Sequence, residues 1–281
     1  MIKKRLFGFG PRGPERPIHL YCYHKSGTVL LHRVFEDITR KFGWSYRECF
    51  GYHEAAPKKS DVTLFAHALV GPAVLDRNHR GIRLIRDPRD VIVSGYLYHK
   101  RTNEPWCINR DLNPSAPITF PRVPYSQEHR SEAWEASYLA SLGGKSYQQN
   151  LLDRTQHDGL LFELAHYGAW TTEAMAAWNA HHPSVLDVRF EEIMADFDGS
   201  FRRIFQYLGF APGQIHDALT LASAHDLGRK THNELEKMNH VSSAEGWNKW
   251  PAYFALTHQE RFREQFPDVL ERLGFEAGDG W

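Results

Sequence analysis

A short polar turn between an apolar strand and an amphipathic helix constrains this chain more than any other feature. Ile18, Leu20 and Cys22 alternate as in a buried strand. A helical pattern follows, with apolar residues at Val29, Leu30, Val34, Phe35 and Ile38. Between the two, residues 24–28 read His-Lys-Ser-Gly-Thr. Such a turn offers an anion free backbone N–H groups, the positive end of a helix dipole, a Lys amine and two hydroxyls. We therefore expect a phosphate or sulfate ester to bind here.

The order of residues in this turn disfavours an ordinary ATP or GTP site. The common phosphate loop reads G-x-x-x-x-G-K-[ST], with its Lys after the second glycine and a hydroxyl on Mg²⁺. Here Lys25 precedes Ser26 and Gly27, and no glycine lies four to six residues upstream. The loop is correspondingly short, which favours a different nucleotide.

A second strand-turn-helix segment lies at residues 82–99. Its apolar start predicts a buried strand at Ile82–Ile85, after which Asp87 is a suitable N-cap and Pro88 falls at the first helical position. Arg86 ends the strand, and Ser94 lies two turns into the helix. We expect both side chains to face one anion.

These two motifs together resemble those of the sulfotransferases that use 3′-phosphoadenosine 5′-phosphosulfate (PAPS). That family's phosphosulfate loop is usually written Tyr-Pro-Lys-Ser-Gly-Thr-Thr-Trp. Its 3′-phosphate element reads Arg-x-Pro-[Lys/Arg]-Asp-x-x-x-Ser, and residues 86–94 match it at every named position. The resemblance covers roughly residues 17–100 and 184–270. It implies an α/β, three-layer, P-loop-like fold with a central parallel sheet flanked by helices.

The resemblance also implies an activity. The enzyme would move the sulfuryl group of PAPS to an acceptor hydroxyl, less often an amine, and release adenosine 3′,5′-bisphosphate (PAP), with no metal. The acceptor would be a glycan, a lipid or a small molecule. Lys25 would neutralise charge on the leaving 5′-phosphate, while Arg86 and Ser94 would hold the 3′-phosphate. The remaining residues of the phosphosulfate loop would bind the same donor: Ser26, Gly27, Thr28 and Val29.

His67 is the expected general base. It follows an apolar strand that contains Val62 and Leu64, and it lies 19 residues before Arg86. The family's base is a His in a Lys-Thr-His-Leu element at this place, and an imidazole titrates near neutral pH. Phe65 stands where that element has its Lys, which removes one positive group near the sulfate.

Other positions match the family in part. Leu30 replaces the Trp that often stacks on adenine, and Phe190 lies in a Phe-Glu-Glu that resembles the family's Tyr-Glu-Asp near the nucleotide. Gly246 and Trp247 begin a segment similar to the family's Gly-Asp-Trp-Lys-Asn-x-Phe. For Phe190, plain core packing is an alternative interpretation.

The family's Arg-Lys-Gly, which closes over the 3′-phosphate, has no counterpart at the expected place. Residues 239–243 read Asn-His-Val-Ser-Ser there. Arg229 and Lys230 lie upstream and are candidates for the missing charge if the loop folds back; solvated surface charge is the alternative.

The chain as a whole predicts one domain over residues 1–281. Residues 1–16 are rich in Gly, Pro and Arg and predict a loose arm. Strand and helix signals alternate over 17–100 and again over 184–210, as in a parallel sheet covered by helices. Residues 101–165 break this alternation with five prolines and many aromatic residues, and we expect them to form a lid or acceptor-binding insertion.

Composition excludes several classes of protein. Lys plus Arg and Asp plus Glu each total 34, without an extended basic run, which argues against nucleic-acid partners. Three cysteines in an odd, unclustered arrangement argue against a disulfide scaffold or a metal site. No apolar run is long enough to span a bilayer, and no apolar signal core is visible. These features predict a cytoplasmic protein; the oligomeric state stays open, a homodimer included.

Two other functions remain open at this point. One is a P-loop nucleotide kinase or NTPase, against which the reversed Lys order argues. The other is a non-catalytic protein that binds adenosine bisphosphate, which the substitutions Phe65 and Leu30 and the missing basic pair would suit.

Overall fold

Five parallel strands form the centre of the protein. The computed structural model describes residues 13–108, 132–178, 182–237 and 246–276. The strands are β1 (Ile18–Cys22), β2 (Tyr46–Phe50), β3 (Val62–Ala66), β4 (Arg80–Ile85) and β5 (Val185–Arg189). Their order in the sheet is β2-β3-β1-β4-β5, and every pairing is parallel. The predicted strands at residues 18–22, 62–66, 82–85 and 185–188 are confirmed.

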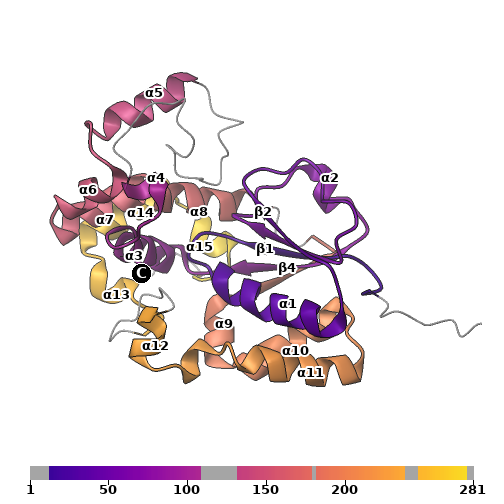
Figure 1. The fold of residues 1–281 in the computed structure, drawn as a ribbon. Coiled ribbons are helices and arrows are strands. Elements are labelled where there is room, and N and C mark those ends of the chain that lie inside the picture. The colour runs from indigo at the N-terminus through magenta and orange to yellow at the C-terminus, as the bar shows by residue number, and fades with distance from the viewer. Residues whose placement is uncertain (1–12, 109–131, 179–181, 238–245, 277–281) are drawn as a thin grey trace, which may run out of the picture.

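Helices cover both faces of this sheet (Figure 1). Ile18, Leu20 and Cys22 of β1 join one apolar cluster with α1 (Thr28–Phe42) and α10 (Phe197–Leu208). Tyr21 and Tyr23 join the opposite cluster with α3 (Pro88–His99) and α8 (Tyr167–Ala177). A strand buried on both faces carries mainly apolar side chains at successive positions, and in β1 all five residues are buried, with His19 the polar exception. The predicted three-layer α/β fold is confirmed.

The remaining helices complete the two outer layers. On the α1 side lie α9 (Phe190–Ala195) and α11 (Pro212–Ser223). On the α3 side lie α6 (Tyr147–Leu152), α7 (Gln156–Ala165), α14 (Leu256–Gln265) and α15 (Val269–Arg272). The other elements are α2 (Pro72–Leu75), α4 (Pro105–Ile108), α5 (Glu132–Ser141), η2 (Leu227–Arg229), α12 (His232–Lys237) and α13 (Trp250–Tyr253).

The local signals for helix ends hold in the structure. Asp87 caps α3 by accepting a hydrogen bond from the Arg89 N–H, with Pro88 at the first position. Gly209 ends α10 in the left-handed conformation, which glycine adopts without strain. Val29 differs from its predicted place on the apolar face of α1, because its side chain is 44 % exposed in the first turn.

The strand order creates a switch point beside β1. This strand pairs with β3 on one side and with β4 on the other. After β1 the chain continues to β2 at one edge of the sheet, and after β4 it continues to β5 at the other edge. Ligands of open parallel sheets bind in the crevice at such a point. The predicted site residues that follow these three strands, Lys25, His67 and Arg86, are thereby brought to one edge.

Parts of the predicted arm and insertion lie outside the described residues, namely 1–12 and 109–131. Within 101–165, α6 and α7 pack against α3 as part of the helical layer. Of the helices in the described ranges, none is both long and apolar enough to cross a membrane.

Candidate functional site

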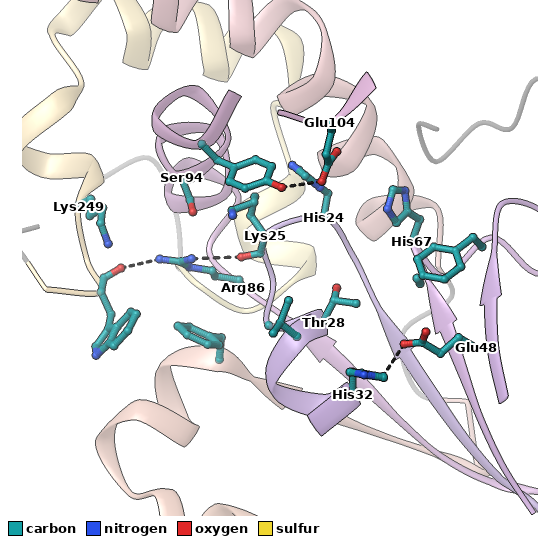
Figure 2. Close-up of a pocket in the computed structure, with 17 residues that line it drawn as sticks. His24, Lys25, Thr28, His32, Glu48, His67, Arg86, Ser94, Glu104 and Lys249 are labelled. Carbon is teal, nitrogen blue, oxygen red and sulfur yellow. Dashed lines mark hydrogen bonds and ion pairs between the residues drawn. The ribbon is translucent and has the colours of Figure 1, made fainter. Parts of the chain in front are cut away.

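A cavity of about 430 Å³ opens at the carboxyl edge of the sheet (Figure 2). One part of its wall comes from the turn between β1 and α1, together with Arg86, Ser94 and Phe190. A second part comes from the ends of β2 and β3 and from the segment after α3. The third part of the wall consists of Trp247 and Lys249, which come from the C-terminal segment of the chain. We call the first and third parts of the wall the donor half. We call the second part, together with His24, the acceptor half.

Hydrogen bonds to one carbonyl hold the β1–α1 turn in shape. The carbonyl oxygen of Tyr23 accepts from the Ser26 hydroxyl at 2.9 Å, from the Ser26 N–H at 3.2 Å and from the Thr28 hydroxyl at 3.1 Å. The Ser26 oxygen in turn accepts from the Tyr23 N–H at 2.8 Å. Ser26 is fully buried and does not line the cavity. Its hydroxyl therefore serves the turn, whereas the sequence suggested that it would contact the anion.

The turn depends on glycine at position 27. Gly27 has a φ of 113°, and a Cβ built on it would lie 2.8 Å from Cδ2 of Leu84 and 3.1 Å from Cδ2 of Phe190. Lys25 also has a positive φ, of 59°. Backbone strain of this kind persists only where the surroundings impose it and is common at ligand sites.

The first turn of α1 leaves backbone donors at the cavity. Among the described residues, none accepts a hydrogen bond from the N–H of Gly27, Thr28 or Val29. All three residues line the cavity. Unpaired N–H groups at the N-terminus of a 15-residue helix form an anion site.

Lys25 lies at the centre of the site. Its Nζ is 3.8 Å from the centroid of the Tyr98 ring. Burial of the amine, followed by the nearby Arg86 charge, lowers the pKa of Lys25 to about 7. An anion in the cavity would raise the pKa of Lys25 by stabilising its charged form, so the protonated amine favours the binding of an anion.

Arg86 and Ser94 face the same cavity, as predicted from their spacing. Arg86 donates from Nη1 to the Lys25 carbonyl at 3.1 Å and from Nη2 to the Trp247 carbonyl at 2.9 Å. Its Nε is buried without a hydrogen-bond partner among the described residues. The Ser94 hydroxyl also has none there, although Ser94 is only 4 % exposed. Buried polar groups are normally paired, so Arg86 Nε indicates a polar ligand, and Ser94 lines the cavity where such a ligand would lie.

Lys249 adds a third cation, which the sequence analysis missed. It is 1 % exposed, lines the cavity and donates from Nζ to the Gly246 carbonyl at 2.5 Å. Asp90 holds it in place by accepting from its backbone N–H at 2.7 Å. The signal was present, because the segment after Gly246 resembled a family motif that contains a Lys.

Two aromatic rings stand beside the cations. Phe190 and Trp247 meet edge to face with ring centroids 5.6 Å apart. The guanidinium of Arg86 lies over the Phe190 ring at 4.8 Å. With the exposed Val29, these rings form an apolar wall in the donor half.

Imidazoles and carboxylates dominate the acceptor half (Figure 2). His67 follows β3 with a φ of 76°, and its ring centroid is 6.0 Å from that of His24. Glu104 accepts from the Tyr98 hydroxyl at 2.5 Å. Nδ1 of His32 lies 2.6 Å from Oε1 of Glu48, and both residues line the cavity. Of these side chains, His67 alone was predicted from the sequence as a site residue.

The structure leaves some predicted residues outside the cavity lining. Arg229 forms ion pairs with Asp198 and Asp226, and Lys230 donates to the Ala224 carbonyl. Gly246 does not line the cavity, whereas Trp247 does. Residues 239–243 lie outside the described part of the chain. Within that part, no group of three or more His, Cys, Asp or Glu side chains is arranged to hold a metal ion.

Comparison with known proteins decides the family. The model of the sulfotransferase domain matches residues 49–274. This chain belongs to the sulfotransferase family. A search of curated proteins found no match. Among solved structures, mouse sulfotransferase SULT7A1 complexed with PAP is similar, with 20 % identity, a TM-score of 0.40, and coverage of 91 % of this chain and 84 % of that chain.

Family membership confirms the resemblance drawn from the two motifs. The sulfotransferase match begins within β2 and takes in the motif at residues 86–94 and the Phe190 and Trp247 positions. The β1–α1 turn precedes the matched range, so its place in the site depends on the geometry described above. The protein is accordingly a transferase of sulfuryl groups.

Proposed function

We propose that this sulfotransferase takes the sulfuryl group from PAPS and transfers it to an acceptor hydroxyl. One observation carries the proposal: the two anion-binding turns, at residues 25–29 and 86–94, open into a single cavity. A donor with a phosphosulfate at one end and a 3′-phosphate at the other needs two such turns. The third cation, Lys249, supports a ligand of high negative charge.

Each end of the donor has a set of protein groups to bind it. The N–H groups of Gly27, Thr28 and Val29 and the amine of Lys25 would bind the 5′-phosphosulfate. Arg86 Nε and the Ser94 hydroxyl would bind the 3′-phosphate. Lys249 would take the part that the family gives to its basic pair, because Arg229 and Lys230 are engaged elsewhere. Adenine would pack against the apolar wall that Phe190, Trp247 and Val29 form.

Sulfuryl transfer resembles phosphoryl transfer, where positioning and charge stabilisation supply most of the rate. Lys25 would stabilise the charge that grows on the leaving 5′-phosphate. His67 would take the proton of the acceptor hydroxyl as general base. Its ring lines the acceptor half of the cavity and is partly exposed, so an acceptor can reach it.

The acceptor would be a glycan, a lipid or a small molecule that enters beside His67 and Glu104. Glu104 is the one lining residue from the described part of segment 101–165, and we propose that this segment selects the acceptor. We also propose a cytoplasmic location, because Cys22, Cys49 and Cys107 are free and buried.

Incubation with labelled PAPS and a panel of glycans, phenols, lipids and small alcohols tests the function. We expect label to move to at least one class of acceptor, with PAP released and no requirement for Mg²⁺. Mg²⁺-dependent phosphate transfer from ATP would instead show a kinase. PAP binding without transfer to any acceptor would show a non-catalytic nucleotide-binding protein.

A further inference from the structure

The acceptor half holds a second imidazole that ends a buried chain of hydrogen bonds. His24 Nε2 lies 3.0 Å from His99 Nε2, and His99 Nδ1 lies 2.9 Å from Glu163 Oε2. His99 is 0 % exposed and Glu163 is 1 % exposed, whereas His24 lines the cavity. The ring planes of His24 and His99 are nearly parallel, with an angle of 9° between them and centroids 5.0 Å apart. The chain thus leads from the cavity into the protein interior.

This chain fixes which nitrogen of each ring carries a proton. The Glu163 carboxylate accepts from the Tyr147 hydroxyl at 2.9 Å and from His99 Nδ1. In the tautomers that satisfy these contacts, His99 donates from Nδ1 to Glu163 and its Nε2 accepts the Nε2–H of His24. The Nδ1 of His24 is left without a proton. No described residue donates a hydrogen bond to it.

His24 is close to the groups that would handle the reaction. Its ring centroid lies 6.0 Å from those of His67 and Tyr98, and it precedes Lys25 in the chain. Figure 2 shows its side chain near Glu104, to one side of Lys25. The phosphosulfate motif has a Pro at this position, so the motif gives no reason for a His here.

The packing around Glu163 favours a positive charge beside its carboxylate. Its Oε1 is buried without a hydrogen-bond partner among the described residues. A Cβ at position 95 would lie 2.5 Å from this oxygen, so Gly95 makes the space for it. An unpaired buried carboxylate oxygen destabilises a fold. A positive charge arriving on His99 would offset that cost.

We propose that His24 is a second proton acceptor of the site, in parallel with His67, and that His99 and Glu163 are positioning residues that act through it. This inference rests on the proposed function. As the acceptor oxygen bonds to sulfur and the bond from sulfur to the 5′-phosphate oxygen breaks, the hydroxyl proton moves to His24 Nδ1. The Nε2 proton of His24 moves to His99 Nε2. The positive charge then lies on His99 beside Glu163, and the leaving electron pair lies on the phosphate.

Transfer of the second proton to His99 lets His24 act as a base although its own basicity is low. Burial, followed by the neighbouring His99, Lys25 and His67, holds the pKa of His24 well below its usual range. The ring is therefore neutral and ready to accept, but it would hold an added proton weakly. Passing the second proton to His99 moves the charge away from Lys25 and next to a carboxylate.

A double-mutant cycle on His24 and His67 tests the inference. We expect His24→Gln to lower kcat only about threefold to tenfold in the wild-type background, but about 10²-fold or more in His67→Ala, where His24 is the remaining acceptor. PAP affinity, measured by calorimetry, should stay within about twofold in both backgrounds. An equal factor in the two backgrounds would overturn the inference, as would a His67→Ala enzyme with no rate above the uncatalysed reaction.

Glu163→Gln should show the same dependence on the background, because it removes the charge that receives the proton. His225→Gln is the matched control, since His225 pairs with Asp37 away from the cavity, and it should have the same small effect in both backgrounds. If Glu163→Gln fails to fold, the His24 cycle still decides, because His24 lines the cavity. Failure of the wild-type enzyme to transfer sulfate would reject the proposed function; an additive cycle would reject only the relay.

Discussion

The two halves of the cavity are built in different ways. The donor half consists largely of two continuous strand-turn-helix segments, in which backbone N–H groups and adjacent side chains face the cavity. The acceptor half is assembled from single side chains on distant segments, such as His24, Glu48 and Glu104. A local motif can therefore specify how a donor is held, whereas the acceptor side depends on how the whole chain packs.

The sharpest test of this division is His67→Ala. We expect kcat to fall about 10²- to 10⁴-fold, because the proton of the acceptor hydroxyl loses its main base. PAP affinity should hardly change, since His67 belongs to the acceptor half. Steady-state kinetics with PAPS and calorimetry with PAP give both values. A full rate in this variant would remove His67 from its role.

Lys25→Met should affect both quantities. We expect kcat to fall about 10²- to 10³-fold, as when one preorganised group that stabilises developing charge is removed. PAP should also bind more weakly, because the 5′-phosphate loses a cation. The contrast with His67→Ala separates the halves in one pair of measurements. A Lys25→Met enzyme with a lower kcat but unchanged PAP affinity would contradict the assignment of Lys25 to the donor half.

Lys249 and Arg229 provide a matched pair within the C-terminal region. Lys249→Met should weaken PAP binding about tenfold or more, because charged hydrogen bonds in a buried site are strong. Arg229→Gln should change it less than about twofold, since its ion pairs are at the surface. Calorimetry compares the two variants directly. The reverse order would show that the loop after η2 reaches the donor and that Lys249 does not.

The pH dependence of PAP affinity tests the charge on Lys25. Burial and the nearby Arg86 lower the pKa of Lys25 to about 7. A bound anion raises this pKa, so PAP binding takes up a proton above about pH 7. Affinity should be greatest near or below about pH 7 and should fall by up to about tenfold per pH unit above it. Lys25→Met should remove this slope. An affinity that is constant from about pH 7 to about pH 9 in the wild type would mean that Lys25 is already charged.

Much of the donor half could be predicted from the sequence. Strand-turn-helix signals and the order Lys-Ser-Gly-Thr lie within a few residues of each other, so their geometry follows from local structure. The same reasoning predicted the three layers and the convergence of Lys25, His67 and Arg86. It misplaced the Ser26 hydroxyl, because hydrogen bonding to the Tyr23 carbonyl inside the turn has no sequence signature.

The acceptor half shows what such reasoning misses. His24 and His99 are 75 residues apart, and His99 and Glu163 are 64 apart. Nothing in their local sequence indicates that they meet. The contact of His99 with Glu163 arises from the packing of α3 against α7, and His24 reaches His99 from the turn between β1 and α1. Lys249 is an intermediate case: its segment was noted, but only the fold shows its side chain at the cavity.

A crystal structure with PAP bound would test the central claim most directly. We predict its 5′-phosphate against the N–H groups of residues 27–29 and Lys25, and its 3′-phosphate against Arg86 and Ser94. PAP bound at another place, or bound here with its 3′-phosphate away from Arg86 and Ser94, would contradict the account.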